Sequence, residues 1–320
     1  GSEMCIRDRN DGSLPGPYIP ADVTVTFGAM KPCAMVPPAS YACGHLTLVD
    51  FGFDIDDCVP ATEMTDGDFV TDSIRLPQLS DGKYSRGVVG LVTGSARYPG
   101  AAVLSSAAAA RTNTGMVRYL GPQRAQDMVL SSLPEAVIGK GRVQSWVVGS
   151  GVPAGDDEAS DSDFQRETIA ALLKHYALPQ ETDLGDDADA RHASALDMPP
   201  IVVDAGALDL LPDKVPPQVV VTPHAGELAR MLTRLGKNEV GVDEVRPQPL
   251  ACARKLRELT GATVLLKGAV TMVVGADGES NERVILSGRA PAWMSTAGSG
   301  DVLAGMLGAL LAQQDDMLAE

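Results

Sequence analysis

The chain has 320 residues, 44% of them hydrophobic, so it is long enough to bury one large core or two smaller ones. Its 42 acidic side chains outnumber its 26 basic ones, and the formal net charge of −16 argues against a nucleic-acid backbone as a partner. A small anion must therefore be bound by backbone N–H groups and by individual Lys or Arg side chains, because the overall field repels it.

The sequence also bears on location and redox state. No stretch is apolar for long enough to span a bilayer, and the N-terminus lacks the apolar core of a signal peptide, which predicts a cytoplasmic protein with no membrane partner. The five cysteines include no Cys-x-x-Cys pair, which favours reduced thiols. We find no cluster of residues with the spacing of a dedicated metal site.

The N-terminal part is short of structural signals. Residues 1–13 are left unassigned as tag-like sequence. Within residues 14–55, β-forming residues predict two strands, at Val23–Phe27 and Leu46–Asp50. Two strands cannot make a stable domain, so we expect this segment to pack on another part of the chain or to belong to a larger unit. Residues 56–84, rich in Asp, Thr and Gly, are interpreted as a linker.

From residue 85 onward, short apolar strands alternate with helical segments. Such alternation predicts an α/β fold with a mostly parallel central sheet and helices on both faces. The expected strands are Val88–Val92, Ser145–Val148, Ile201–Val203, Gln218–Val221, Thr263–Leu266 and Thr271–Val274. The expected helices are Gly100–Arg111, Phe164–Ala177, Gly226–Leu235, Pro249–Leu259 and an apolar segment at Met306–Gln313. Residues 179–199, acidic and rich in Ala, are interpreted as a surface insertion.

Polar residues gather where the expected strands end. They are Thr93-Gly-Ser95, Gly149-Ser-Gly151, Asp204, Thr222–Glu227 and Lys267-Gly268. Ligands of parallel α/β sheets bind beyond the carboxyl ends of the strands. The sequence therefore predicts a binding site at this edge of the sheet.

The stretch Ser295–Gly305 is the most informative part of the sequence. Its turn, Gly298-Ser299-Gly300, opens a helix, so backbone N–H groups and the helix dipole combine into an anion site. Asp301 follows directly, and a carboxylate there is suited to handling a proton or a metal ion near a phosphoryl group. Alternatively, Ser299 or Asp301 is only a helix N-cap, since both residue types are favoured there. The spacing alone leaves both interpretations open.

Two further motifs also allow two interpretations. Lys267, with Gly268 after it and Thr271 four residues on, is suited to a nucleotide phosphate or ribose, but it could equally be a solvated lysine in a hairpin turn. His224 and Glu227 lie one turn apart at the expected start of a helix. They are candidates for ligand contact, or else a capping carboxylate and a hydrogen-bonded histidine.

Taken together, these motifs resemble the ADP- or ATP-dependent NAD(P)H-hydrate dehydratases, a family with a ribokinase-like fold. The resemblance covers residues 85–320, and the family continues with further helices beyond the one that follows Asp301, which implies a domain shortened at its C-terminal end. It rests on Thr93-Gly-Ser95 with Tyr98–Ala102, Val148–Gly151, Val203–Ala205, Thr222–Glu227, Lys267–Thr271 and Ala297–Gly305, in the family's order.

The chain departs from the family pattern in three places. The family commonly has Pro where this chain has Ala225, Asp where it has Gly206, and Gly-Pro-Gly-x-Gly where it has Gly149–Pro153. Gly155, displaced by two residues, is a candidate for the missing third glycine. These departures put in doubt the details of dinucleotide binding rather than the class of reaction.

The resemblance implies a reaction and a role for each motif. In this family, ADP or ATP phosphorylates the hydroxyl of a hydrated NADH or NADPH ring, and elimination of phosphate then restores the dinucleotide. Asp301 would be the catalytic base, and the N–H groups of Gly298, Ser299 and Gly300 would stabilise the transferring phosphoryl group. Lys267, Gly268, Ala269, Val270 and Thr271 would bind the nucleotide, while Ala101, Gly151, His224, Glu227 and Asp301 would bind the hydrated dinucleotide. Use of a nucleotide implies Mg²⁺, and the resemblance also implies a homo-oligomer.

Residues 14–55 resemble the last part of the NAD(P)H-hydrate epimerase domain that is fused ahead of the dehydratase in many bacteria. The resemblance rests on Ala21–Gly28, Lys31-Pro32 and Val49-Asp50. The catalytic and potassium-binding portion of that domain lies upstream in the family, so the resemblance implies no epimerase activity for this chain.

Two other functions remain open from the sequence. One is a ribokinase-like kinase of a small vitamin precursor, because that superfamily shares the Gly-x-Gly-Asp turn; Thr222–Glu227 and the segment at 14–55 argue against it. The other is a non-catalytic nucleotide-binding protein.

Overall fold

The computed structural model describes residues 11–14, 16–55, 58–155, 164–179, 186–236, 238–277 and 281–314, with the side chains of 186 and 187 excepted. The chain forms two compact units, each assembled from separate segments. The first unit comprises Gly1–Phe69, His224–Leu259 and Val264–Pro291, and the second comprises Val70–Pro223, Thr260–Thr263 and Ala292–Glu320. Within the described ranges, no helix has the length and apolar character needed to cross a membrane.

The second unit is built on six parallel strands in the order β9-β8-β7-β4-β5-β6. All five residues of β4 are buried, as expected for a parallel strand covered on both faces. The predicted strands β4, β7 and β8 are confirmed residue by residue, and β9 begins one residue later than expected. The strands are β4 (Val88–Val92), β5 (Met116–Tyr119), β6 (Val137–Ile138), β7 (Ser145–Val148), β8 (Ile201–Val203) and β9 (Val219–Val221).

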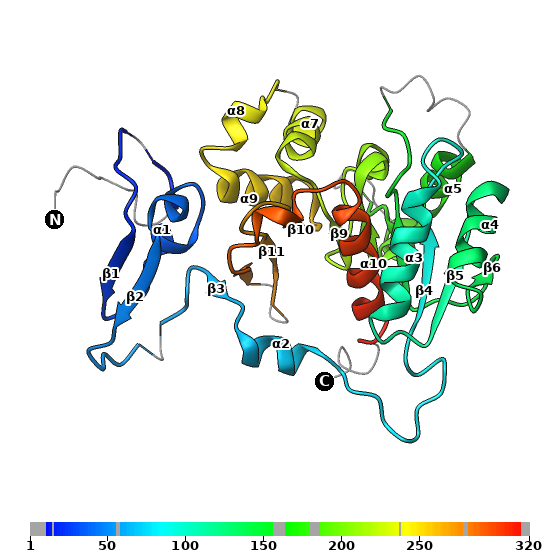
Figure 1. The fold of residues 1–320 in the computed structure, drawn as a ribbon. Helices are drawn as coiled ribbons and strands as arrows, with labels where there is room; N and C mark the ends of the chain where they lie inside the picture. Colours follow the sequence, from blue (N-terminus) through cyan, green and yellow to red (C-terminus); the bar gives the residue numbers. More distant parts are fainter. Residues whose placement is uncertain are drawn as a thin grey trace. The chain divides into compact units, whose positions relative to one another are not determined.

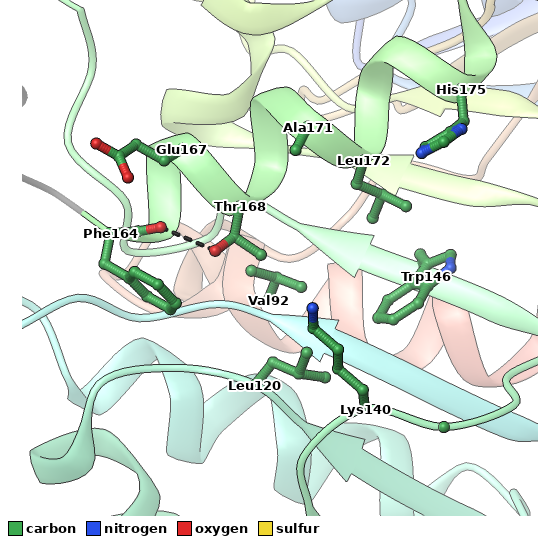
Figure 2. Close-up of a pocket in the computed structure, with 11 residues that line it drawn as sticks. Val92, Leu120, Lys140, Trp146, Phe164, Glu167, Thr168, Ala171, Leu172 and His175 are labelled. Atoms are coloured by element: carbon green, nitrogen blue, oxygen red, sulfur yellow. Dashed lines mark hydrogen bonds between the residues drawn. The ribbon is translucent and has the colours of Figure 1, made fainter.

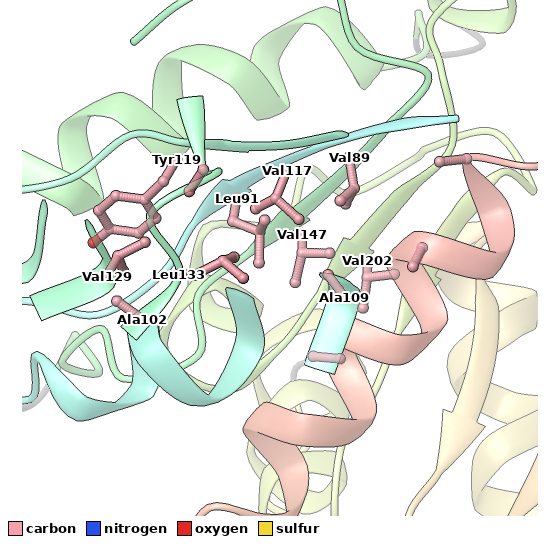
Figure 3. Packing of buried hydrophobic residues seen from close by; sticks show 14 of the residues in the cluster. Val89, Leu91, Ala102, Ala109, Val117, Tyr119, Val129, Leu133, Val147 and Val202 are labelled. Carbon is pink, nitrogen blue, oxygen red and sulfur yellow. The ribbon is translucent and has the colours of Figure 1, made fainter. Parts of the chain in front are cut away.

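Helices cover both faces of this sheet. On one face, α3 (Gly100–Arg111), α4 (Gln123–Ser132) and α10 (Ser299–Leu311) pack on the side chains of alternate strand residues (Figure 3). On the other face, α5 (Phe164–Leu173) lies opposite Val92 and Trp146 (Figure 2). This arrangement confirms the predicted α/β class. The remaining described helices of this unit are η2 (Lys174–Tyr176), α6 (Asp186–Leu196), η3 (Ala205–Leu210) and η4 (Ala292–Met294).

Two glycines of α10 allow this helix to lie close to α3 and to the sheet. A Cβ at Gly305 would lie 2.2 Å from the carbonyl oxygen of Ser105 in α3, and one at Gly308 would lie 2.1 Å from Cγ2 of Val147. The hydroxyl of Ser145, at the start of β7, donates to the carbonyl of Gly308 (2.6 Å). The later part of α10 is thus fixed at the amino end of the strands, which leaves its first turn at their carboxyl ends, as for α3.

The first unit contains the antiparallel strands β10, β11 and β12, with β3 parallel to β12. Most strand pairs of the chain are nevertheless parallel, as predicted. The strands are β3 (Glu63–Met64), β10 (Thr263–Leu266), β11 (Met272–Ala276) and β12 (Glu282–Leu286); the helices are α7 (Ala225–Gly236), α8 (Val242–Val245) and α9 (Pro249–Thr260). Figure 1 shows these elements in chain order.

The N-terminal part of the first unit contains β1 (Val23–Phe27) and β2 (His45–Val49), which pair in parallel, with α1 (Pro32–Met35) and η1 (Ala39–Ala42) between them. The predicted strand β1 is confirmed, and β2 begins one residue earlier than expected. This part contacts the rest of its unit: the guanidinium of Arg289 donates to the carbonyl of Ser40 (2.8 Å). The phenol of Tyr41 hydrogen-bonds the backbone of Val270, while partial burial raises the pKa of this phenol.

Several elements escaped prediction. Within 56–84, interpreted as a linker, the chain forms β3 and α2 (Gly67–Ser73). Strand β5, helix α4 and strands β6 and β12 were also missed, because charged residues such as Arg118 and Arg283 interrupt their apolar patterns. The acidic stretch 179–199 includes helix α6, whose Ala195 is fully buried, so its described part is not a simple surface insertion. Residues 180–185 lie outside the described part.

The α3–α10 contact predicts a stability effect. Substitution Gly305→Ala places a methyl group against the Ser105 carbonyl, and we expect overpacking to destabilise the fold by about 1–3 kcal/mol, measured as a lower midpoint of urea unfolding. The control is Gly100→Ala in the first turn of α3, where no atom lies within 4 Å of the added Cβ and where we expect no loss. Equal midpoints for the two variants would contradict the close contact.

Candidate functional site

At the carboxyl edge of the sheet in the second unit, two glycine-rich loops close on each other. Gly94, Gly149 and Gly151 have φ values of +70°, +102° and +69°, which side chains disfavour. A Cβ at Gly149 would lie 2.0 Å from the carbonyl oxygen of Asp204, and one at Gly151 would lie 2.3 Å from the Cβ of Ala101. The N–H of Gly94 donates to the carbonyl of Ser150 (2.7 Å). The structure thus brings Gly151 and Ala101 together at the first turn of α3.

Asp204 lies beneath these loops, at the end of the central strand β8. Its side chain is buried, and its two carboxylate oxygens accept hydrogen bonds from the hydroxyls of Ser150 and Thr222, both at 2.8 Å. Ser150 follows β7 and Thr222 follows β9, the two strands that flank β8. Sequence analysis identified all three residues at strand ends but missed that they form one network; the signal was a hydroxyl residue one or two positions after each neighbouring strand.

Asp301 lies in the first turn of α10. The N-cap is Gly298, with φ +89°, a residue that has no side chain to cap the helix. The hydroxyl of Ser299 donates instead to the carbonyl of Thr296 (2.9 Å). The N-cap position is therefore occupied by Gly298, and Ser299 and Asp301 lie inside the first turn of the helix. A Cβ at Gly298 would lie 2.6 Å from Cδ1 of Leu104 in α3, so the turn Gly298–Asp301 lies against the early part of α3, at the sheet edge that also carries Ala101 and Gly151.

In the first unit, Glu227 connects the other two motifs. Its buried carboxylate accepts the backbone N–H of His224 (2.7 Å) and lies 3.7 Å from Nζ of Lys267 and 3.5 Å from Nε2 of His224. Lys267 directly follows β10, and its backbone forms an isolated parallel β-bridge with that of His224. Lys267 does occupy the hairpin turn between β10 and β11, as the alternative interpretation held. Its side chain is only 20% exposed, however, so it is not a solvated lysine.

His224 and Glu227 form a reciprocal cap at the start of α7. Nδ1 of His224 accepts the N–H groups of Gly226 (3.0 Å) and Glu227 (3.3 Å), while the Glu227 carboxylate accepts the N–H of His224. Their structural role as a capping pair is therefore observed. It does not exclude ligand contact, because the His224 side chain is 56% exposed.

The turn from Lys267 to Thr271 is held by hydrogen bonds of its backbone. Thr271 donates its N–H to the hydroxyl of Ser287 (2.9 Å) and accepts the N–H of Ser287 (2.9 Å). Ala269 accepts the N–H of Ala290 (2.7 Å). Val270 is buried, whereas Gly268 and Ala269 are exposed, so the turn presents its tip to solvent. This geometry suits contact with a nucleotide through Lys267 and the exposed backbone.

Two of the three departures from the family pattern, Gly206 and the loop Gly149–Pro153, lie against each other. A Cβ at Gly206 would lie 2.2 Å from the carbonyl oxygen of Val152, so the loop Gly149–Pro153 occupies the space that a side chain at 206 would need. Gly155 has its N–H bonded to the carboxylate of Asp209 (2.8 Å) and lacks the positive φ of Gly149 and Gly151.

A cavity of about 600 Å³ lies elsewhere, beneath α5 (Figure 2). Its wall includes Val92, Leu120, Lys140, Trp146 and Leu172. None of the predicted site residues lines it, and it lies on the opposite face of the sheet from α3 and α10. Among the described residues, no group of three or more His, Cys, Asp or Glu side chains is arranged to hold a metal ion.

Comparison with known proteins adds a decisive observation. A profile of NAD(P)H-hydrate dehydratases matches residues 89–320, well over half of the chain. The chain belongs to the NAD(P)H-hydrate dehydratase family. It is 41% identical over 314 residues to the bifunctional NAD(P)H-hydrate repair enzyme Nnr of Mycobacterium tuberculosis and 40% identical to that of Mycobacterium leprae. Each alignment covers 94% of this chain but 55% of the relative, so the chain spans about half the length of these curated relatives.

Solved structures show which fold the chain has. A ribokinase-like superfamily protein from Enterococcus faecalis has a TM-score of 0.60 at 20% identity, covering 79% of this chain and 80% of its own. The ADP/ATP-dependent NAD(P)H-hydrate dehydratase from Bacillus subtilis, co-crystallised with ATP/Mg²⁺, has a TM-score of 0.57 at 20% identity, covering 79% of this chain and 83% of its own. The fold of this family member is therefore ribokinase-like, as predicted.

The capping pair can be separated from ligand binding by one substitution. We expect His224→Asn to preserve the thermal midpoint, because Asn is a favoured N-cap, whereas His224→Ala should destabilise the protein by about 1 kcal/mol. If the imidazole contacts substrate, both variants should lose activity on hydrated NADH to a similar degree. Full activity in His224→Asn, combined with loss in His224→Ala, would restrict His224 to capping.

Proposed function

We propose that this chain catalyses the nucleotide-dependent dehydration of the (S)-hydrate of NADH or NADPH, a hydro-lyase reaction of metabolite repair. The observation that carries the proposal is the glycine turn Gly298–Gly300, which places Asp301 in the first turn of α10 at the carboxyl edge of the sheet. Membership of the dehydratase family supports it. The overall change converts hydrate and ADP, or ATP, into the reduced dinucleotide, phosphate and AMP, or ADP.

Asp301 is proposed as the catalytic base. Its carboxylate accepts the proton of the ring hydroxyl while that oxygen forms a bond to the terminal phosphorus and the bond from phosphorus to the leaving nucleotide breaks. The N–H groups of Gly298, Ser299 and Gly300 stabilise the charge on the transferring group. The carbon–oxygen bond of the ring then breaks, and inorganic phosphate leaves with a ring proton, which restores the reduced nicotinamide.

The remaining roles are assigned to the other motifs of the family pattern. Lys267, with the turn from Gly268 to Thr271, binds the phosphates and ribose of ADP or ATP; the exposed tip and the partly buried ammonium support this. Ala101, Gly151 and His224 contact the hydrated dinucleotide. Glu227 supports His224 and Lys267 through its carboxylate, which lies within 3.7 Å of both side chains.

A magnesium ion is proposed to accompany the nucleotide. The Bacillus subtilis dehydratase was co-crystallised with ATP/Mg²⁺. Mg²⁺ is held by phosphate oxygens, waters and one or two carboxylates, so it needs no cage of protein ligands, and the Asp301 carboxylate is of the right chemical type. The ion would neutralise charge on the phosphates.

The organisation of the chain is also a proposal. Residues 14–55 would be the end of an epimerase-type domain, 56–84 a connecting segment and 85–320 the dehydratase domain. The names of the bifunctional relatives and their greater length support this, as does the two-stranded parallel sheet β1–β2, whose Val23, Val25 and Phe27 are exposed on one face. That apolar face also supports a homo-oligomer. The four described cysteines are thiols rather than half-cystines, which supports the cytoplasm as location.

The function is tested by incubating the protein with hydrated NADH and either ADP or ATP. We expect recovery of the absorbance of reduced nicotinamide together with release of inorganic phosphate. A small-molecule kinase would leave a stable phosphorylated alcohol, and a non-catalytic binding protein would bind nucleotide without turnover. Either outcome would overturn the proposal.

The role of Asp301 gives a separate prediction. Asp301→Asn keeps the size of the side chain but cannot accept the hydroxyl proton, so we expect kcat for dehydration to fall by roughly a hundredfold or more. Nucleotide affinity should stay the same or improve slightly, because a negative charge beside the phosphates is removed. The matched control is Asp243→Asn, whose side chain is 98% exposed in α8 and should leave kcat unchanged. Near wild-type turnover in Asp301→Asn would exclude a base at this position.

A further inference from the structure

A buried carboxylate requires an explanation wherever it occurs. Asp204 is 2% exposed, yet it lies among the apolar ends of β8 and its neighbours. Removing such a group from water is costly unless its oxygens accept hydrogen bonds. Both carboxylate oxygens do so, each from a hydroxyl at 2.8 Å. Asp204, Ser150 and Thr222 therefore form one hydrogen-bonded network, called the junction below.

The junction connects three neighbouring strand ends to the loops above them. Ser150 continues the connection, because its backbone carbonyl accepts the N–H of Gly94 (2.7 Å). The next residue, Gly151, lies against Ala101 in the first turn of α3. On the other side, Thr222 lies two residues before His224 in the chain. Residues proposed to contact the hydrated dinucleotide thus follow both hydroxyl partners of Asp204 within two positions.

The nucleotide turn is held by different groups. Within its own unit, the backbone from Ala269 to Thr271 is bonded by Ser287 and Ala290. Asp204 is hydrogen-bonded instead to Ser150 and Thr222, which belong to the second unit. A change at Asp204 should therefore affect one substrate more than the other.

We infer that Asp204 is a positioning residue for the hydrated dinucleotide, which fixes Ser150 and Thr222 so that the loops at Gly94 and Gly149–Gly151 keep the conformation that this substrate requires. The inference rests on the proposed function. Asp204 does not touch the reacting atoms, because it is buried; it acts through its two hydroxyl partners.

Two substitutions at 204 separate positioning from charge. Asparagine has one accepting oxygen and one donating amide, and a serine or threonine hydroxyl can accept as well as donate, so Asp204→Asn can keep both bonds. Leucine is of similar size and can keep neither. Loss of both hydrogen bonds frees the two hydroxyls that hold the loops, so we expect Asp204→Leu to raise KM for the hydrate by about tenfold or more. Asp204→Asn should restore KM to within about threefold of the wild type.

The decisive measurement is KM for each substrate in four variants. For Asp204→Leu, Ser150→Ala and Thr222→Val, we expect KM for the hydrate to rise while KM for ADP or ATP stays constant. Lys267→Ala is the contrasting variant, in which the nucleotide KM should rise and the hydrate KM should not. Equal rises in both KM values for Asp204→Leu, or loss of thermal stability with unchanged KM, would overturn the inference and leave Asp204 a structural residue.

Hydrogen exchange of the protein without substrates provides a readout that does not need activity. The N–H of Gly94 should exchange faster in Asp204→Leu than in wild type, and as slowly as wild type in Asp204→Asn and Lys267→Ala. If wild type fails to dehydrate the hydrate, the proposed function fails, and this exchange pattern still tests the junction: unchanged protection of Gly94 would overturn it. Ser150→Ala and Thr222→Val each remove one hydroxyl, and they serve if Asp204→Leu does not fold.

Discussion

The contact between α3 and α10 is the constraint on which the arrangement of the second unit depends. The carbonyl oxygen of Ser105 lies where residue 305 would carry a side chain, so the two helices approach to backbone distance. Helix α10 also has a glycine, Gly308, at the point where it contacts Val147 in the sheet. Because α10 is fixed along this seam, its first turn and Asp301 are held at a defined place on the sheet edge. A helix free to slide would leave the position of Asp301 undefined.

Two buried carboxylates of this acidic protein, those of Glu227 and Asp204, are stabilised by hydrogen bonds. Glu227 accepts a backbone N–H and faces both His224 and Lys267, so one buried carboxylate caps a helix and also contacts two basic side chains. The carboxylate of Asp204 accepts hydrogen bonds from two hydroxyls. In both places hydrogen bonds of defined direction limit the cost of burying negative charge.

The sequence alone predicts the layers of the fold well and the networks of the site poorly. Strands such as β4 and β7 are continuous apolar runs with glycine turns after them, so burial on both faces makes them easy to predict. Strand β5, by contrast, carries Arg118, and its burial depends on strands and helices distant in sequence. Residues near Asp301, Lys267 and His224 were predicted from local turn chemistry. The bonds of Asp204 were not, because Ser150 and Thr222 are 54 and 18 residues away from it.

The contact between Gly206 and the carbonyl of Val152 bears on how sequences of this kind can change. One position lacks a side chain so that a loop 54 residues earlier can occupy its space. A substitution at 206 without a compensating change in Gly149–Pro153 forces a steric conflict, whereas a loop of different shape opens room for a side chain there. The departures at Gly206 and in Gly149–Pro153 therefore depend on each other. Mutational effects at these sites are expected to be epistatic, and transplanting either segment alone between relatives carries a penalty that transplanting both avoids.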